Sequence, residues 1–300
     1  MSVIVENITK IFGVQKALDD VSFSIDNGEV VGFLGPNGAG KSTMMKIITG
    51  YLRPDNGVVK VCNQIVDGNS TEVRRLIGYL PEHNPLYLDM YVKEYLSMVA
   101  GIYGMNNIKE RVATIVEQTG LTPEQHKLIG ALSKGYRQRV GIAQALISNP
   151  QVVILDEPTT GLDPNQIIEI RELIKKIGKE RTVILSTHIM QEVEAVCDRV
   201  IVIDHGHKRA DGSIDSIAQQ TDKEFCINVE FASDIIVDEL RKQFNQQNIT
   251  KLSDKRFQIK SSSDIRTDIF KFATNNKLIL TELHLEHNDM EHLFHQLTTN

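Results

Sequence analysis

The sequence predicts an α/β domain followed by a smaller α+β domain. Short apolar runs at 30–34, 152–155, 182–186 and 200–203 alternate with stretches of helical periodicity. Continuous runs of this kind are typical of strands that are buried on both faces of a sheet. The 300-residue chain contains 20 glycines, but the last of them is Gly212. Since glycine supplies backbone conformations that other residues rarely adopt, the two parts of the chain must differ in their loops.

The first domain contains the elements expected of a layered α/β structure. An alternating run at 21–25 precedes the continuous run at 30–34, and a helical pattern then ends at Gly50. After Pro164, isoleucines recur at spacings of three and four residues, which gives one apolar helical face. These isoleucines are Ile167, Ile170, Ile174 and Ile177. The later apolar runs are predicted to be strands.

The second domain shows alternating strand patterns and short amphipathic helices. The predicted strands include 225–231, a short strand with Phe257 and Ile259, and a strand around 278–285. The predicted helices carry Ile236, Leu240 and Phe244, and then Ile265, Ile269 and Phe272. The expected order of elements, β-α-β-β-α-β, resembles a ferredoxin-like unit.

A polar stretch between Gly212 and Lys223 marks the domain boundary, so the domains are predicted at 1–215 and 220–300. A final helical segment is predicted to start near Met290. Four of the nine histidines gather near this segment, at His284, His287, His292 and His295. Histidines with nearby carboxylates invite a metal site, but no cysteine is close and no other motif needs a second metal. We therefore interpret this segment as a polar terminal helix.

Composition excludes several classes of protein. No apolar run approaches the roughly 18–20 residues that span a bilayer, and the first ten residues do not resemble a signal peptide. The three cysteines, Cys62, Cys197 and Cys226, are odd in number and widely spaced, which fits a reducing cytosol without a disulfide framework. The net charge of -6 disfavours nucleic acid as a partner, because nucleic-acid-binding proteins usually carry a basic footprint.

Residues 35–43, GPNGAGKST, form the most specific motif in the chain. The pattern Gly-x4-Gly-Lys-Ser follows the apolar run VVGFL and precedes a helical pattern, as a phosphate-binding loop requires. Its glycines permit successive backbone amides to point inwards, and with the helix N-terminus these amides attract phosphate. Lys41 is placed to reach the β- and γ-phosphates, and the Ser42 hydroxyl is placed to ligate Mg²⁺. An ordinary glycine-rich turn would need neither the Lys-Ser pair nor an apolar strand before the motif and a helix after it.

Two adjacent acids, Asp156 and Glu157, follow the apolar run at 152–155. Ligand sites of parallel α/β sheets lie at this edge of the strands. Asp156 is therefore expected to hold Mg²⁺, and Glu157 to orient or deprotonate the attacking water. His188 follows the next apolar run and would contact the γ-phosphate. Taken alone, the two acids would suit a helix N-cap equally well, and the histidine would suit a structural role. The phosphate-binding loop favours a catalytic site, because bound phosphates need such partners.

Together these motifs resemble the ATP-binding subunit of an ABC (ATP-binding cassette) transporter over about residues 2–212. GPNGAGKST matches the Walker A motif, and LSKGYRQ at 132–138 lies at the signature motif. ILDEP matches the Walker B motif, Gly161-Leu162-Asp163 matches the D-loop, and His188 matches the switch histidine. The resemblance implies the P-loop NTPase fold of an ABC nucleotide-binding domain, with a mixed sheet and a helical subdomain at about 85–150.

The resemblance also implies a head-to-tail homodimer that holds ATP and Mg²⁺ between its subunits. Phe12 lies where the family places an aromatic ring against adenine, and Asp163 joins the nucleotide-binding set. Ser133 and Gly135 would bind the γ-phosphate of the nucleotide that the other subunit holds. The Walker A residues of the nucleotide-binding set are Gly35, Pro36, Asn37, Gly38, Ala39, Gly40, Lys41, Ser42 and Thr43. The expected catalytic residues are Lys41, Glu157 and His188.

The chain departs from the family pattern at two motifs. Lys134 and Tyr136 replace a glycine and the glutamine of the usual signature, and Lys134 adds charge there. Glu82 stands where the family normally has the Q-loop glutamine. Its carboxylate would ligate Mg²⁺, so we place it with Ser42 and Asp156 in the metal set. Alternatively, Glu82 repels phosphate and weakens nucleotide binding.

Five of the seven tyrosines lie between residues 79 and 103. The family docks its membrane subunit on the segment that corresponds to 82–105, and aromatic enrichment suits such an interface. Packing of these rings within the helical subdomain is an equal alternative.

The resemblance implies an ATPase that powers a separate transmembrane permease from the inner face of the cell membrane. The Lys-containing signature, the Tyr-Leu-Pro-Glu loop and the short second domain resemble the exporter-type branch of the family. The stretch LPEHNPLYLDMYVKEYL further resembles gliding-motility-associated ATP-binding subunits of bacteria. A soluble ABC ATPase that acts on ribosomes or DNA is the alternative, although such proteins usually carry two cassettes or a long coiled coil. A regulatory module with degraded catalysis is disfavoured by the intact Lys41, Asp156, Glu157 and His188.

Overall fold

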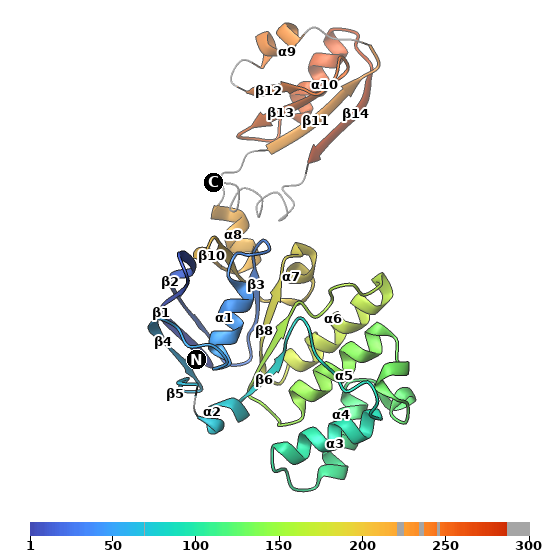
Figure 1. Cartoon of the computed structure of the whole chain (residues 1–300). Coiled ribbons are helices and arrows are strands. Elements are labelled where there is room, and N and C mark those ends of the chain that lie inside the picture. The colour runs from blue at the N-terminus through green and yellow to red at the C-terminus, as the bar shows by residue number, and fades with distance from the viewer. Residues whose placement is uncertain (69, 221–224, 234–236, 245–246, 287–300) are drawn as a thin grey trace. The chain divides into compact units, whose positions relative to one another are not determined.

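A computed structural model describes residues 1–68, 70–220, 225–233, 237–244 and 247–286 of the chain (Figure 1). The chain divides into two compact units, of which the first spans Met1–Ile214 and the second begins at Asp215. Among the residues described, no helix has both the length and the apolar character needed to cross a bilayer.

The first unit contains a four-stranded antiparallel sheet with the strand order β2-β1-β4-β5. Its strands are β1 (Val3–Phe12), β2 (Gln15–Ile25), β4 (Asn56–Val61) and β5 (Gln64–Ile65). The alternating run at 21–25 forms the end of β2, where Val21, Phe23 and Ile25 are buried on one face. Alternation indicates that this sheet is covered on one face, unlike the strands with continuous apolar runs.

The second sheet of this unit has six strands in the order β10-β9-β3-β8-β7-β6. They are β3 (Val30–Leu34), β6 (Ile77–Leu80), β7 (Val152–Asp156), β8 (Thr182–Thr187), β9 (Arg199–Asp204) and β10 (His207–Gly212). All neighbours are parallel except β10, which pairs antiparallel with β9. The parallel strands end at one edge, so segments distant in the sequence meet after β3, β7 and β8. The α/β fold class is confirmed.

Helices cover both faces of the six-stranded sheet (Figure 1). Helix α1 (Lys41–Ile48) buries Met44 and Met45 between this sheet and the antiparallel one. The opposite face packs against a helical layer whose buried side chains include Ile170 and Ile174. Its helices are α3 (Val92–Ile102), α4 (Ile108–Gln118), α5 (Lys134–Leu146), α6 (Pro164–Gly178) and α7 (Met190–Val196). Shorter helices of this unit are α2 (Thr71–Arg75), η1 (Thr122–Glu124) and η2 (Ile129–Ala131), and α8 (Ile214–Gln220) begins at the boundary between the two units.

The described residues of the second unit from Phe225 to Glu286 form a four-stranded antiparallel sheet in the order β12-β13-β11-β14, together with helices α9 and α10. In chain order its elements are β11 (Phe225–Phe231), α9 (Val237–Gln243), β12 (Asn248–Lys251), β13 (Arg256–Ser261), α10 (Arg266–Asn275) and β14 (Leu280–Glu286). This order is β-α-β-β-α-β, as in a ferredoxin-like unit. Edge-to-face pairs of aromatic rings, Phe231 with Phe257 and Phe244 with Phe272, fill its core.

The histidine cluster lies mostly outside the residues that the structure describes. His287, His292 and His295 fall beyond the last of them, as do Met290 and the predicted terminal helix, and Ile236 lies in an earlier gap. His284 lies on β14, and its Nδ1 is 2.9 Å from Oε1 of Glu282. Within the described residues, no group of three metal-binding side chains was found.

Two glycines provide a matched test of the close contact between β6 and α5. A side chain at Gly78 would overlap the backbone carbonyl of Ala145 and lie 2.9 Å from Pro150, so Gly78→Ala should destabilise the protein by about 1–3 kcal/mol. Gly101 lies in α3 with nothing within 4 Å of the added atom, so Gly101→Ala should stabilise it by about 1 kcal/mol. Calorimetric unfolding measures both changes. An unchanged melting temperature for Gly78→Ala would contradict the packing described.

Candidate functional site

A left-handed backbone shapes the loop between β3 and α1. Gly38 and Gly40 have φ angles of 84° and 109°, a region that side chains rarely adopt. A side chain at Gly40 would also approach the carbonyl oxygen of Ala17 on β2 to 2.5 Å. Position 40 therefore needs glycine for two reasons. The backbone is left-handed there, and the neighbouring strand β2 leaves no room for a side chain. Its amides and the first turn of α1 present partial positive charge at the sheet edge.

The loop borders a cavity of about 550 Å³ at the carboxyl edge of the parallel strands. The cavity is lined by Ala17, Asn37, Gly38, Gly40, Lys41, Ser42, Thr43, Glu82, Glu157, Thr160 and His188. All of these except Ala17 and Thr160 were predicted from the sequence to belong to the site. Ala17 comes from the antiparallel sheet, and Thr160 follows β7 by four residues. Neither carries a recognisable motif signal.

Lys41 is the buried cation of this cavity, with 6% of its side chain exposed. Its Nζ donates hydrogen bonds to the carbonyl oxygens of Gly35 and Pro36 at 2.7 and 3.2 Å. The same nitrogen lies 3.7 Å from Oε1 of Glu157. Burial lowers the pKa of Lys41, while the negative charges of Glu157, Asp156 and Glu82 oppose that shift. The ammonium group thus holds the loop and the carboxylates together.

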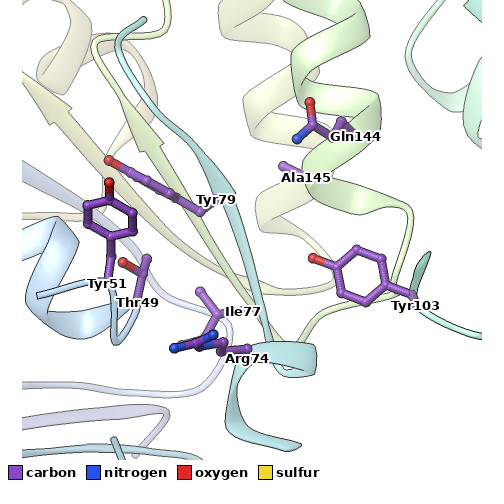
Figure 2. Close-up of a pocket in the computed structure, with 8 residues that line it drawn as sticks. All are labelled: Thr49, Tyr51, Arg74, Ile77, Tyr79, Tyr103, Gln144 and Ala145. Atoms are coloured by element: carbon purple, nitrogen blue, oxygen red, sulfur yellow. The ribbon is translucent and has the colours of Figure 1, made fainter. Parts of the chain in front are cut away.

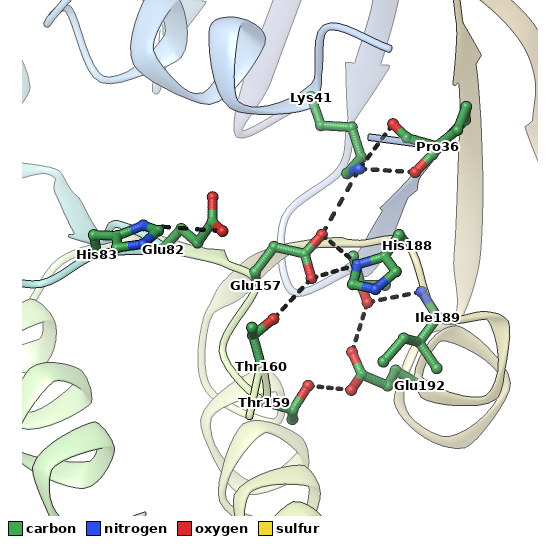
Figure 3. A network of polar contacts seen from close by, with 12 residues as sticks. Pro36, Lys41, Glu82, His83, Glu157, Thr159, Thr160, His188, Ile189 and Glu192 are labelled. Carbon is green, nitrogen blue, oxygen red and sulfur yellow. Dashed lines mark hydrogen bonds and ion pairs between the residues drawn. The ribbon is translucent and has the colours of Figure 1, made fainter. Parts of the chain in front are cut away.

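Glu157 and His188 form a close polar pair beside Lys41 (Figure 3). Nδ1 of His188 is 3.0 and 2.9 Å from the two carboxylate oxygens of Glu157, and the Thr160 hydroxyl donates to Oε2 at 3.2 Å. Glu157 has a φ of 51°, and its N–H donates to the carbonyl oxygen of Ser186 on β8. A glutamate in the left-handed region costs about 1–3 kcal/mol, so surrounding contacts must hold it there. This geometry is typical of a functional carboxylate.

Asp156 lies deeper, with 1% of its surface exposed. Burial raises its pKa, and the hydroxyls of Ser186 and Ser42 oppose this shift. Its Oδ1 atom is buried and accepts no hydrogen bond within the described part of the protein. A buried carboxylate oxygen without a partner destabilises a protein unless a cation or donor completes it. The oxygen atoms of Asp156, Ser42 and Glu82 therefore have the chemistry of a hard divalent cation site.

Seven predicted nucleotide-binding residues do not line the cavity. Gly35, Pro36 and Ala39 belong to the loop itself, and the other four lie outside it. Phe12 is half exposed at the end of β1, with Lys10 Nζ 5.6 Å from its ring centre. Ser133 caps α5 by accepting a hydrogen bond from the N–H of Tyr136, and Gly135 packs against Gln166. Asp163 caps α6 by accepting from the N–H of Gln166 at 3.0 Å.

The sequence interpretation missed a buried network behind Glu157 and His188. Glu192 on α7 is 1% exposed and accepts hydrogen bonds from the hydroxyls of Thr159 and Thr187 (Figure 3). A usable signal was present, because Glu192 occupies the apolar face of α7 together with Met190 and Val193. A carboxylate at a core position of an amphipathic helix indicates a specific buried partner.

A second hollow of about 440 Å³ is lined by tyrosines (Figure 2). Its residues are Thr49, Tyr51, Arg74, Ile77, Tyr79, Tyr103, Gln144 and Ala145. Burial raises the pKa of Tyr79, and the charge of Asp156 adds to this shift. We call this hollow the tyrosine groove.

The tyrosines between 79 and 103 divide between packing and exposure. Tyr95 is buried, and its hydroxyl donates to Gln144 at 2.6 Å, so it packs the helical layer. Tyr87 and Tyr91 are at least half exposed. Packing within the helical layer therefore accounts for Tyr95, while Tyr87 and Tyr91 are accessible at the surface.

Comparison with known proteins agrees with this geometry. Residues 18–160 match the family described as ABC transporter. The ABC transporter ATP-binding protein NatA of Bacillus subtilis (strain 168) is 39% identical over 227 residues, 74% of this chain and 92% of that protein. The Nod factor export ATP-binding protein I of Rhizobium sp. (strain N33) is 37% identical over 216 residues, 71% of each chain.

A solved structure described as a dimeric post-hydrolysis state of the ATP-binding cassette MJ0796, bound to ADP and Pi, superposes with a TM-score of 0.64. It is 27% identical and covers 71% of this chain and 98% of that chain. The phosphate-binding loop, the buried carboxylates and these relatives lead to one conclusion. The chain belongs to the family of ATP-binding subunits of ABC transporters, which are ATPases.

Proposed function

We propose that this ATPase powers a separate transmembrane permease, and that two copies of the chain close head to tail on ATP. The cluster of Lys41, Glu157 and His188 at the cavity carries the proposal of hydrolysis. The position of the signature supports the dimer, because Ser133 does not line the cavity of its own chain. A γ-phosphate in that cavity would meet the Ser133 hydroxyl and the amides of α5 only if a second copy supplied them.

Each catalytic side chain has a distinct proposed role. The Lys41 ammonium exchanges the carbonyl oxygens of Gly35 and Pro36 for phosphate oxygens. Glu157 orients the attacking water and accepts its proton, in a site where burial strengthens the interaction. His188 keeps the carboxylate of Glu157 directed into the cavity and contacts the γ-phosphate.

Ser42, Asp156 and Glu82 would hold Mg²⁺. The orphaned Oδ1 of Asp156 supports this assignment, because a cation would complete its coordination. When bound, the ion neutralises phosphate charge during transfer. Glu82 lines the cavity, and its negative charge reaches Lys41, so it also balances that cation in the absence of nucleotide.

The rest of the nucleotide would extend beyond the phosphate cavity. The exposed ring of Phe12 is available to stack on adenine. The Walker A residues of 35–43 would wrap the phosphates, and Asp163 would approach the dimer interface from the start of α6. These assignments follow the family motifs, with the glycine geometry of the loop as their physical support.

We propose that the tyrosine groove and the exposed Tyr87 and Tyr91 receive the membrane subunit at the inner face of the cell membrane. The groove combines aromatic rings with Arg74 and Gln144, a composition that suits protein interfaces (Figure 2). Its wall residue Tyr79 pairs with Ile154 on β7, the strand that ends at Asp156, so the groove is adjacent to the proposed cation site.

We further propose export as the direction of transport, with a link to gliding motility. The name of the Nod factor relative includes the word export, which supports that direction. The link to gliding motility is supported by the segment from Leu80 to Leu96, which resembles gliding-motility-associated ATP-binding subunits of bacteria. The alternative, a soluble ABC ATPase on ribosomes or DNA, predicts a different partner for the same groove.

Glu157→Gln should lower ATP hydrolysis by at least about 100-fold, because a general base contributes about 10²–10⁴-fold to rate. The neutral amide should still permit ATP binding, so an ATP-bound dimer should accumulate in size-exclusion chromatography. Glu169→Gln, the same change at an exposed residue of α6, is the matched control. Undiminished hydrolysis would contradict the role of Glu157, and a monomer with bound ATP would contradict the dimer.

Asp156→Asn should raise the melting temperature of the nucleotide-free protein at neutral pH. The pKa of Asp156 is raised above 3.8, so the folded state binds this proton more tightly than the unfolded state. Its charged form therefore destabilises the fold, and the gain from Asn should shrink as the pH falls towards 3.8. Mg²⁺ with ATP should further stabilise the wild type more than the variant.

The control for this prediction is Asp55→Asn. Asp55 has a lowered pKa because it accepts from the N–H of Ile11 and pairs with Lys10. Its removal should therefore lower the melting temperature or leave it unchanged. Stabilisation by both substitutions, or a gain at Asp156 that grows towards low pH, would refute the burial argument.

A photo-crosslinking amino acid at Tyr103 should capture an integral membrane protein from native membranes. The same probe at Ile65, which is exposed on β5 outside the groove, is the control and should not. Mass spectrometry identifies the captured chain. Capture of a ribosomal protein at Tyr103 would overturn the permease proposal in favour of the soluble alternative.

A further inference from the structure

A single buried carboxylate joins the two loops that carry the catalytic pair. Glu192 accepts a hydrogen bond from the Thr159 hydroxyl at Oε1 and one of 2.7 Å from the Thr187 hydroxyl at Oε2 (Figure 3). Thr159 lies two residues after Glu157, in the segment after β7. Thr187 ends β8 and directly precedes His188. One side chain on α7 therefore fixes both segments relative to each other.

The network is closed to water. Thr159, Thr187 and Glu192 are at most 3% exposed. Within the described part of the chain, no lysine, arginine or histidine forms an ion pair with Glu192, so the two hydroxyls carry the stabilisation of its charge. A buried carboxylate is costly unless its oxygens are hydrogen bonded, and such networks specify one arrangement of their parts.

The direction of the hydrogen bonds explains why a carboxylate, and not an amide, is needed at position 192. The Thr187 hydroxyl accepts from the N–H of Ile189 at 3.1 Å while it donates to Glu192. These bonds hold the backbone on both sides of His188. An amide at position 192 replaces one of the two carboxylate oxygens with an NH2 donor, so it cannot offer a separate acceptor oxygen to each threonine hydroxyl as the carboxylate does.

We propose that Glu192 is a positioning residue for hydrolysis, which sets His188 against Glu157. It also connects His188 to the segment that runs from Thr159 to Asp163, where the second copy of the chain would make contact. Closure of the dimer would thus be transmitted to His188 through this carboxylate. The inference rests on the proposed roles of Glu157 and His188.

Glu192→Gln should lower kcat for ATP hydrolysis about tenfold, because small displacements of catalytic groups have effects of up to about 100-fold. The KM for ATP should stay within about twofold, since no cavity-lining residue changes. Thr187→Val should have the same effect, whereas Thr187→Ser, which keeps the hydroxyl, should retain most of the activity. Combining Glu192→Gln with Thr187→Val should cost little more than either alone.

Asp211→Asn is the matched control. Asp211 is partly buried on β10 and accepts hydrogen bonds from Arg199, which lies at the opposite end of β9 from the cavity. Loss of this contact should lower the melting temperature without changing kcat. If Glu192→Gln behaves in the same way, with a lower melting temperature and an unchanged kcat, Glu192 is only structural and the inference is wrong.

Histidine NMR of the nucleotide-free protein supplies a second readout. The ring signals of His188, identified by their absence in His188→Ala, should shift in Glu192→Gln and Thr187→Val but not in Asp211→Asn. Unshifted signals would overturn the positioning role. If Glu192→Gln does not fold, Thr187→Val removes a single hydroxyl and keeps the test available.

The outcomes separate this inference from the function on which it rests. Loss of activity in Glu157→Gln and His188→Ala, with full activity in Glu192→Gln, refutes only the positioning role. Full activity in Glu157→Gln and His188→Ala refutes the proposed catalytic roles and the inference together.

Discussion

The neutralisation of buried carboxylates at one sheet edge is the constraint on which this site depends. Asp156 and Glu157 are both less than a tenth exposed, and Glu82 faces the same cavity. Like charges in a poorly solvated space repel each other and raise pKa values. Lys41 is the buried cation that balances them, and it reaches Glu157 while it bonds two carbonyl oxygens of its own loop. A nucleotide polyphosphate would therefore compete with these groups for Lys41, and a divalent cation at the proposed site would offset the added negative charge.

The strand order explains why these groups meet. Strands β3, β8 and β7 are neighbours in the sheet, although more than a hundred residues separate β3 from β7 in the chain. Because all three run parallel, the loop after β3 lies beside the acids after β7 and the histidine after β8. Helix α1 then directs its N-terminus at the same point, and its buried methionines anchor it between the two sheets. The site is thus a consequence of topology more than of any single helix or loop.

Sequence reasoning was successful where a local pattern encodes a physical requirement. The glycine spacing of 35–43 encodes a backbone path around phosphate, and the left-handed angles of Gly38 and Gly40 agree with it. Continuous apolar runs encode burial on both faces, which the six-stranded sheet shows. The reasoning did not assign the antiparallel sheet of β1, β4 and β5, whose pairing depends on long-range contacts. It also missed Ala17 and Thr160, because their roles arise only when distant segments are brought together. Glu192 was missed although its buried position on α7 offered a local signal, since its two threonine partners lie at the end of β8 and beyond the end of β7.

Lys134, which stands where the family signature has a glycine, lies close to Gly161 of its own chain. The ammonium of Lys134 occupies the space where a side chain at Gly161 would stand, so it lies along the segment between β7 and α6 of its own chain. Gly161 is left-handed, with a φ of 70°, and leaves room for this cation. Lys134, at the start of α5, therefore lies beside the segment that continues from Thr159, whose hydroxyl donates to Glu192.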